Sequence, residues 1–360
     1  MKTPFAHRRR LLQLRIAELR LNGLLVTHPA NWYYLTGFTG EAGALLVSRK
    51  HSVLITDGRF TKQAREEASG VRIVPQKGSL VETLGQIARE RFRGKIGFDP
   101  YQVTVGQLQA ARRTAGLRVR WAAAASLVES LRGKKEAGEL AEMRKASLLA
   151  GNVLQGVLKL LKPGVREQEI AAEIEYQMRK RGAAGPSFES IVAFGERSAY
   201  PHARPTSKRL KKNELVVLDL GAILGHYCSD ITRTVFVGRA PSRVRRWYAA
   251  VQEAQTAAIA TVKAGVPCGD VDAAARGVLA KHRLDRYFVH STGHGLGLEV
   301  HEEPRVARGQ KQTLVPGNVI TIEPGVYVPG VGGIRIEDDV AVHANSTETL
   351  TRVPRDLIEL

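Results

Sequence analysis

The sequence predicts a two-domain α/β protein, with an N-terminal α/β domain at residues 1–132 and an α+β domain at residues 133–360. Three observations lead to this prediction. Strand-like and helix-like segments alternate through the first third of the chain, the composition shifts near residue 130, and the second part contains an internal repeat. A length of 360 residues is sufficient for two ordinary domains.

The N-terminal elements follow from hydrophobic spacing. Leu12, Ile16 and Leu19 share one helical face, and Gly23 is expected to end that helix. The segment 31–40 carries aromatic residues and predicts a packed loop, with a pocket lining as the alternative. Further helices are expected at 61–67 and 81–91. Strands are expected at 24–26, 44–47, 52–55, 71–74 and 95–98.

The second domain is expected to begin with a charged helix over 134–159, which sets the domain boundary to within about ten residues. A repeat follows. Lys162-Pro163-Gly164-Val165 and Lys263-Ala264-Gly265-Val266 each precede a helix, at an offset of 101 residues (263 minus 162). Each half then continues with a His-x-x-Pro segment, a strand ending in a carboxylate, a turn, and a second carboxylate.

The segment 215–234 is the clearest hairpin signal in the chain. An apolar run ends at Asp219, glycines allow a turn, and alternation resumes around Asp230. The alternative interpretation is that the two residues are a turn aspartate and a strand-end aspartate with no shared function. The repeat adds Glu323 and Glu337 at the matching positions of the second half, so folding of the two halves face to face would gather four carboxylates.

Four buried carboxylates need positive charge, and a pair of divalent metal ions is the obvious source. His294, within the glycine-rich segment 290–297, is the candidate imidazole ligand. Oxygen ligands with one imidazole suit Mn, Co, Fe or Zn more than a structural tetrahedral zinc. Two such ions polarise a carbonyl and activate water, which indicates hydrolysis.

These segments resemble the creatinase, prolidase and aminopeptidase P branch of the "pita-bread" metallopeptidases. The matching stretches are 218–234, 290–304, 321–328 and 332–339, with looser matches at 34–38 and 55–60. The resemblance implies a creatinase-like N-terminal domain and a pita-bread domain with an internal pseudo-twofold repeat. It also implies five metal ligands, two of which, Asp230 and Glu337, bridge both ions. The ligands are Asp219, Asp230, His294, Glu323 and Glu337.

The resemblance also implies roles around the metal. His290 falls on a family position, and His202 and His301 would hold the substrate carbonyl and the developing oxyanion as protonated imidazoles. Glu323 is the expected proton shuttle, and Arg335 is expected to orient Glu337. The alternative for each of these histidines is an ordinary loop residue whose ring nitrogens are hydrogen-bonded and which has no catalytic role. Cys228 is expected to be a packing residue and not a ligand.

The expected function is hydrolysis of the N-terminal Xaa-Pro bond of short peptides by an aminopeptidase P-like enzyme. The alternatives are an Xaa-Pro dipeptidase (prolidase) and, less favoured, a creatinase-like hydrolase. Two divalent ions are expected, with Mn favoured over Co or Zn, and the resemblance implies a homodimer. No arginine in the sequence is singled out as a clamp for a dipeptide carboxylate, so tripeptides are expected to be cleaved at least as well as dipeptides.

Charge and composition limit the other function classes. The net charge is +19, and residues 1–132 hold 22 Lys+Arg against 9 Asp+Glu. Such an excess can attract nucleic acid, and an inactive binding module is the competing hypothesis. The intact ligand set and the lack of a nucleic-acid motif argue against it. No apolar run approaches a membrane span, no signal peptide follows the arginines at 8–10, and two unpaired cysteines suit a cytoplasmic protein.

Overall fold

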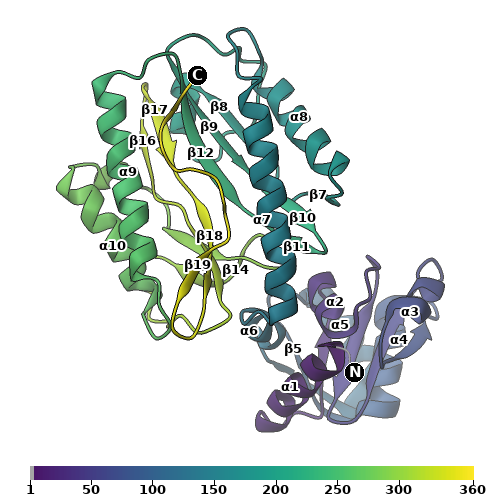
Figure 1. Cartoon of the computed structure of the whole chain (residues 1–360). Coiled ribbons are helices and arrows are strands. Elements are labelled where there is room, and N and C mark those ends of the chain that lie inside the picture. Colours follow the sequence, from purple (N-terminus) through teal and green to yellow (C-terminus); the bar gives the residue numbers. More distant parts are fainter. Residues whose placement is uncertain (1–3) are drawn as a thin grey trace. The chain divides into compact units, whose positions relative to one another are not determined.

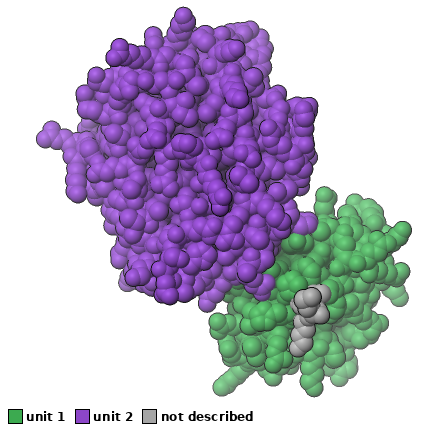
Figure 2. Space-filling view, in the orientation of Figure 1, with its two compact units in different colours: residues 1–132 green, residues 133–360 purple. Residues whose placement is uncertain are grey.

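The computed structural model describes residues 4–360, and the chain divides into two compact units at the Arg132–Gly133 bond (Figures 1 and 2). The two are called here the N-terminal unit and the C-terminal unit. Their elements confirm the expected fold class, an α/β domain followed by an α+β domain with a duplicated core. Among the described residues, no helix has the length and apolar character needed to cross a membrane.

The N-terminal unit is a six-stranded mixed sheet with helices packed on it, in the strand order β4-β3-β2-β1-β5-β6. Its strands are β1 (Gly23–Val26), β2 (Ala44–Ser48), β3 (Ser52–Thr56), β4 (Arg72–Pro75), β5 (Gly94–Phe98) and β6 (Val119–Ala123). Its helices are α1 (Pro4–Glu18), α2 (Pro29–Thr36), α3 (Thr61–Glu67), α4 (Leu80–Ile87), α5 (Val105–Ala115) and α6 (Leu127–Arg132). A core of buried aliphatic and aromatic side chains lies between the sheet and α4 and α5.

The expected strands correspond to β1 to β5, whereas β6 was not predicted and the boundary between α1 and β1 was wrong. Helix α1 ends at Glu18 and Leu19 is 47% exposed, because the chain reverses at Arg20 (φ 53°) and Gly23 begins β1 instead of ending the helix. The helix expected at 81–91 is α4, which starts at residue 80 and passes into a π-helix, η1 (Ala88–Phe92).

The aromatic segment expected as a loop contains helix α2. A proline at its start and Gly37 at its end (φ 83°) are the usual signals of a short helix. Trp32 and Tyr34 are each only 2% exposed, and the Trp32 indole donates a hydrogen bond to the Gly40 carbonyl at 3.2 Å. These rings therefore pack inside the unit and do not line a pocket.

The C-terminal unit has two sheets, ordered β20-β12-β9-β8 and β14-β13-β15-β18-β19, with smaller sheets beside them. Its helices are α7 (Ala137–Leu158), α8 (Glu167–Lys180), α9 (Ser242–Thr261) and α10 (Cys268–Lys281). The strands of the first half are β7 (Gly185–Pro186), β8 (Ile191–Phe194), β9 (Glu214–Leu220), β10 (Ala222–Leu224), β11 (Tyr227–Cys228) and β12 (Ile231–Val237). Those that follow are β13 (Gly293–Gly295), β14 (Glu302–Val306), β15 (Val319–Ile322), β16 (Gly325–Val328), β17 (Gly332–Arg335), β18 (Asp338–Val342), β19 (Thr347–Thr349) and β20 (Ile358–Glu359).

Equivalent backbone hydrogen bonds confirm the internal repeat. The Gly164 amide donates to the Leu210 carbonyl at 2.8 Å, and 101 residues later the Gly265 amide donates to the Leu314 carbonyl at 2.8 Å. Both glycines have positive φ, 102° and 89°, which explains why each repeat carries a glycine there. Helices α7 and α8 cover one half and α9 and α10 the other, with the strands between the two pairs (Figure 1).

The repeat places carboxylates at matching strand ends. In the first half, β9 pairs antiparallel with β12, so Leu220 faces Ile231 and brings Asp219 and Asp230 to the same end. In the second half, β15 pairs antiparallel with β18, so the residues flanking the Ile322–Asp338 pair are Glu323 and Glu337. The two halves meet where the Glu337 amide donates to the Thr232 carbonyl at 3.2 Å.

Candidate metal centre and active site

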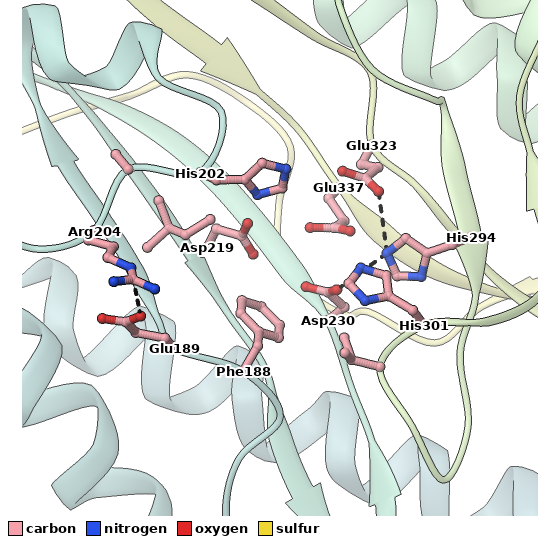
Figure 3. A pocket seen from close by; sticks show the side chains of 13 residues that line it. Phe188, Glu189, His202, Arg204, Asp219, Asp230, His294, His301, Glu323 and Glu337 are labelled. Atoms are coloured by element: carbon pink, nitrogen blue, oxygen red, sulfur yellow. Dashed lines mark ion pairs between the residues drawn. The ribbon is translucent and has the colours of Figure 1, made fainter. Parts of the chain in front are cut away.

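A pocket of about 290 Å³ lies where the two halves of the C-terminal unit meet. All five expected metal ligands line it, together with His202 and His301 (Figure 3). Asp230 and Glu337 lie between His202 and His294, with Asp219 beside His202 and Glu323 close to His294 (Figure 3). His290 and Arg335, the other two residues expected at the site, lie behind this pocket and not on its lining.

The donor set fits divalent cations. Within the described residues, Asp230, His294 and Glu337 each offer a ligand atom, and these atoms lie within 4.8 Å of one another. The buried Oδ1 atoms of Asp219 and Asp230 accept no hydrogen bond from the described part of the chain. Because a buried carboxylate oxygen without a donor is costly, these oxygens indicate a place for a cation.

His294 is held so that one nitrogen faces the carboxylates. Its Nδ1 lies 3.0 Å from the Gly295 carbonyl and donates to it, which leaves Nε2 at 3.4 Å from Glu323 Oε1 and 3.8 Å from Asp230 Oδ2. Burial lowers the pKa of His294 to about 4, so the ring is neutral and Nε2 carries a lone pair. A neutral imidazole fixed through its other nitrogen is the usual form of a metal-binding histidine.

Glycines explain how β13 can carry this histidine between two other strands. A Cβ on Gly293 would stand 1.8 Å from the Thr321 carbonyl oxygen, and one on Gly295 would stand 2.3 Å from the Glu303 carbonyl oxygen. Both positions therefore exclude any side chain.

The crowded carboxylates resist ionisation when no cation is present. Burial, followed by the neighbouring carboxylates, raises the pKa of Asp230 and of Glu337 well above the ordinary range, and burial raises the pKa of Glu323 to about 8. A divalent ion replaces the protons that the carboxylates otherwise keep, so proton release is expected to accompany metal binding.

A prediction on stability follows from the sign of these shifts. Unfolded carboxyls ionise near pH 4, so the metal-free folded protein holds extra protons up to about pH 8 and loses stability as the pH rises through that range. The buried histidines have lowered pKa values, so below their unfolded pKa of about 6.5 they act in the opposite direction. We therefore expect the Tm gap between Mn²⁺-loaded and EDTA-treated protein to widen from about pH 6.5 to about pH 8.

Differential scanning calorimetry of both forms at the two pH values measures this gap. A constant gap, or one that narrows as the pH rises, would show that the carboxylates do not carry protons in the metal-free fold.

Arg335 holds two of the carboxylates from behind. Its Nη2 donates to Asp219 Oδ2 at 2.6 Å, and its Nε donates to the Thr232 hydroxyl at 3.0 Å. That hydroxyl donates to Glu337 Oε2 at 2.6 Å. Arg335 therefore contacts Asp219 directly and Glu337 through Thr232. The sequence analysis expected the link to Glu337, and the direct contact with Asp219 is additional.

His290 belongs to the same buried network. Arg335 Nη1 donates to the Tyr327 hydroxyl at 2.6 Å, and this hydroxyl lies 2.8 Å from His290 Nε2. Burial raises the pKa of Tyr327 to about 12 and lowers the pKa of His290 to about 3, so the phenol keeps its proton and donates to the neutral ring. Tyr327 was not singled out in the sequence, although it lies inside the matching segment 321–328.

Two buried acids hold the loops that carry these histidines. Glu167 on α8 accepts from the amides of Phe194 and Thr206 at 2.9 Å each, which fixes both ends of the segment containing His202. Asp272 on α10 accepts from the Thr292 amide at 3.2 Å and hydroxyl at 2.8 Å. The Thr292 carbonyl in turn accepts from the Glu323 amide at 2.8 Å, so α10 positions the segment beside the pocket.

His202 and His301 have rings on the pocket lining, as the resemblance requires for substrate contact. The His301 ring packs against His294 with ring centroids 4.4 Å apart. Although His301 is exposed overall, partial desolvation of its ring, and then His202, lowers its pKa, while Asp219 acts in the opposite direction. At this position the lowered pKa favours a neutral ring with an N–H over the protonated imidazole that the resemblance implies.

The pocket also contains residues that the sequence gave no reason to select. Phe188, Ile191, Ala203 and Val300 supply an apolar wall. At the rim, Arg204 and Glu189 form an ion pair at 3.3 Å, with both side chains exposed (Figure 3). Cys228 is buried among apolar side chains, and burial raises the pKa of its thiol to about 12, so it is a packing residue as expected.

Comparison with known proteins now identifies the family. Residues 141–344 match the model of metallopeptidase family M24, and residues 8–133 match the creatinase/prolidase N-terminal domain. The chain belongs to metallopeptidase family M24. M24 metallopeptidases use divalent metal ions, which agrees with the carboxylate-rich centre.

Individual relatives of this M24 metallopeptidase cover almost its whole length. An Xaa-Pro dipeptidase of Pyrococcus horikoshii is 34% identical over 94% of this chain and 95% of its own. The structure of an Xaa-Pro dipeptidase from Bacillus anthracis superposes with a TM-score of 0.95 at 36% identity, covering 99% of this chain and 100% of the other. That of an X-Pro aminopeptidase from Thermotoga maritima gives 0.89 at 32%, covering 96% and 100%.

Proposed function

We propose that this M24 metallopeptidase is a dinuclear exopeptidase that removes the first residue from short peptides with proline in second place. The observation that carries the proposal is the convergence of four carboxylates and one neutral imidazole in a pocket that also holds two further histidines. Relatives named for Xaa-Pro hydrolysis, at 32–36% identity over nearly the full length, support the substrate class.

The residues that would hold two divalent ions are Asp219, Asp230, His294, Glu323 and Glu337, and the resemblance implies that Asp230 and Glu337 would contact both. When bound, the ions supply Lewis acidity toward the peptide carbonyl and lower the pKa of water. The protein supplies the rest of the chemistry through groups that are already held in place by its own hydrogen bonds.

Several residues in and beside the pocket have proposed tasks. Glu323 takes the proton of the attacking water on a carboxylate oxygen and returns it to the proline nitrogen as the bond breaks. His202 and His301 donate ring N–H groups to the carbonyl oxygen as it becomes negative. Phe188 and Val300 belong to the apolar wall, which suits the proline ring. Arg335 positions Asp219 and Glu337 from outside the pocket lining.

The experiment for this proposal is hydrolysis of Ala-Pro and Ala-Pro-Ala against Ala-Ala and Ala-Ala-Ala. Metal-free protein receives Mn²⁺, Co²⁺ or Zn²⁺ in separate assays. The expected result is metal-dependent release of alanine from the proline peptides alone. Equal turnover of the proline-free peptides would overturn the substrate class, and turnover without metal would overturn the mechanism. Mn²⁺ as the cellular ion and a homodimer are proposed from the resemblance, and a cytoplasmic location is proposed from the two unpaired cysteines.

A dipeptidase is the second candidate, and Arg204 is the observation that favours it. A dipeptide presents a carboxylate directly after proline, and an arginine on the pocket lining is the group suited to meet it. Arg204 is 84% exposed, however, and is already paired with Glu189. Because exposed ion pairs contribute about 0–1 kcal/mol, we expect this residue to impose little selectivity.

The prediction is therefore that Ala-Pro-Ala is cleaved at least as well as Ala-Pro, and that Arg204→Gln changes the ratio of their kcat/KM values by less than about threefold. Steady-state assays of both peptides on wild type and variant measure the ratio. A preference of about tenfold or more for Ala-Pro, equal to about 1.4 kcal/mol and lost in Arg204→Gln, would establish the dipeptidase instead.

A further inference from the structure

The N-terminal unit contains a pocket of about 340 Å³ to which the peptidase chemistry gives no role. It lies at one end of the sheet, where the turn into β3 and the start of β4 are neighbours, since Val53 pairs with Arg72. The π-helix η1 completes the lining with Arg91 and Phe92. The lining residues are Lys50, His51, Ser52, Val53, Gly70, Arg72, Arg91 and Phe92.

The charge of this pocket is of one sign. Lys50, Arg72 and Arg91 line it, and no carboxylate is among its lining residues. Within residues 4–360, these three cationic side chains make no ion pair. Other exposed cations of the same unit do find acids, as in the Arg15–Glu18 and Arg59–Asp57 pairs.

Three unpaired cations around one cavity repel one another, and a multiply charged anion removes that repulsion. The excess of positive charge in residues 1–132 acts in the same direction, because it raises the local concentration of anions. We propose that this basic pocket binds an oligophosphate, either a free inorganic one or the phosphate chain of a nucleotide.

The chemistry and size of the pocket suit this ligand class. Guanidinium groups bind phosphate oxygens through paired N–H donors, and Lys50 adds a point charge. The volume lies at the lower end of small-molecule sites, which begin at about 300 Å³. A single-stranded nucleic acid is disfavoured, because base stacking needs an exposed ring and Phe92, the only aromatic lining residue besides His51, is 5% exposed.

The test is isothermal titration of the full, metal-loaded protein with inorganic triphosphate and, separately, with ATP at about 150 mM salt. The pocket variant is Arg72→Gln/Arg91→Gln. The matched control is Arg112→Gln/Arg113→Gln, which removes two exposed arginines of the same unit from helix α5, away from the pocket. Any phosphate bound by the metal centre contributes equally in all three proteins, and Xaa-Pro hydrolysis by each variant verifies its fold.

We expect saturable binding by wild type, a Kd raised by about tenfold or more in the pocket variant, and a change below about twofold in the control. Equal affinity for both ligands assigns recognition to the phosphate chain, and tighter binding of ATP assigns it to a nucleotide. Absence of saturable binding in wild type would overturn the proposal. Equal weakening in both variants would also overturn it, because the binding would then depend on the overall positive charge of the unit and not on the pocket.

Discussion

Asp230→Asn is expected to lower kcat by about 10³-fold or more and to remove at least one bound metal ion, while the protein stays folded. Asp230 precedes β12 and is the proposed ligand shared by both ions. Its buried Oδ1 has no hydrogen-bond donor among the described residues, so an ion is the natural partner. The amide replacement keeps the size of the side chain and removes its charge.

Metal content by mass spectrometry, together with turnover of an Xaa-Pro peptide, checks this result. Asp270→Asn is the matched control, because Asp270 is an exposed residue in the first turn of α10 and does not line the pocket. Near-normal turnover by Asp230→Asn with two ions still bound would refute the assignment of this ligand.

His301→Ala is expected to lower kcat by about 10²–10³-fold, the usual cost of losing one donor to a developing oxyanion. Metal content should stay at the wild-type level, because the ring lines the pocket beside His294 without being part of the proposed ligand set. KM should change less than kcat, since the contact strengthens in the transition state.

The pH profile adds a second readout for His301. Partial desolvation lowers the pKa of this ring, so activity should not require an imidazolium and should not fall as the pH rises through the ordinary histidine range. His301→Gln, which retains an N–H donor, is the conservative comparison and should recover part of the rate. Collapse of metal occupancy in His301→Ala would make His301 a ligand and would change the proposed roles of both pocket histidines.

The sequence predicted the C-terminal unit well because the signals for its strands and carboxylates are local and are repeated in its two halves. The apolar strand before Asp219 and the matching strand before Glu323 each end in a carboxylate, and one repeat offset relates the two halves. Strand pairing then brings the carboxylates together, as the Leu220–Ile231 and Ile322–Asp338 pairs show.

Other parts of the site depend on contacts between distant segments, which a single sequence does not reveal. Tyr327 links Arg335 to His290, and Asp272 on α10 holds Thr292. No spacing rule connects these residues. The lowered pKa of His301 also depends on the groups that the fold places around its ring, which a single sequence does not reveal. In the N-terminal unit, α2 is a short helix whose aromatic residues have no clear helical spacing, so only its proline and glycine boundaries indicate it.

The most direct test of the central claim is a manganese titration of metal-free protein in which bound ion and Xaa-Pro turnover are measured on the same samples. If Asp219, Asp230, His294, Glu323 and Glu337 hold two ions that act together, full activity appears only as the second ion binds, and occupancy saturates at two ions per chain. Full activity at one ion per chain, with no further change when more manganese binds, would contradict the account.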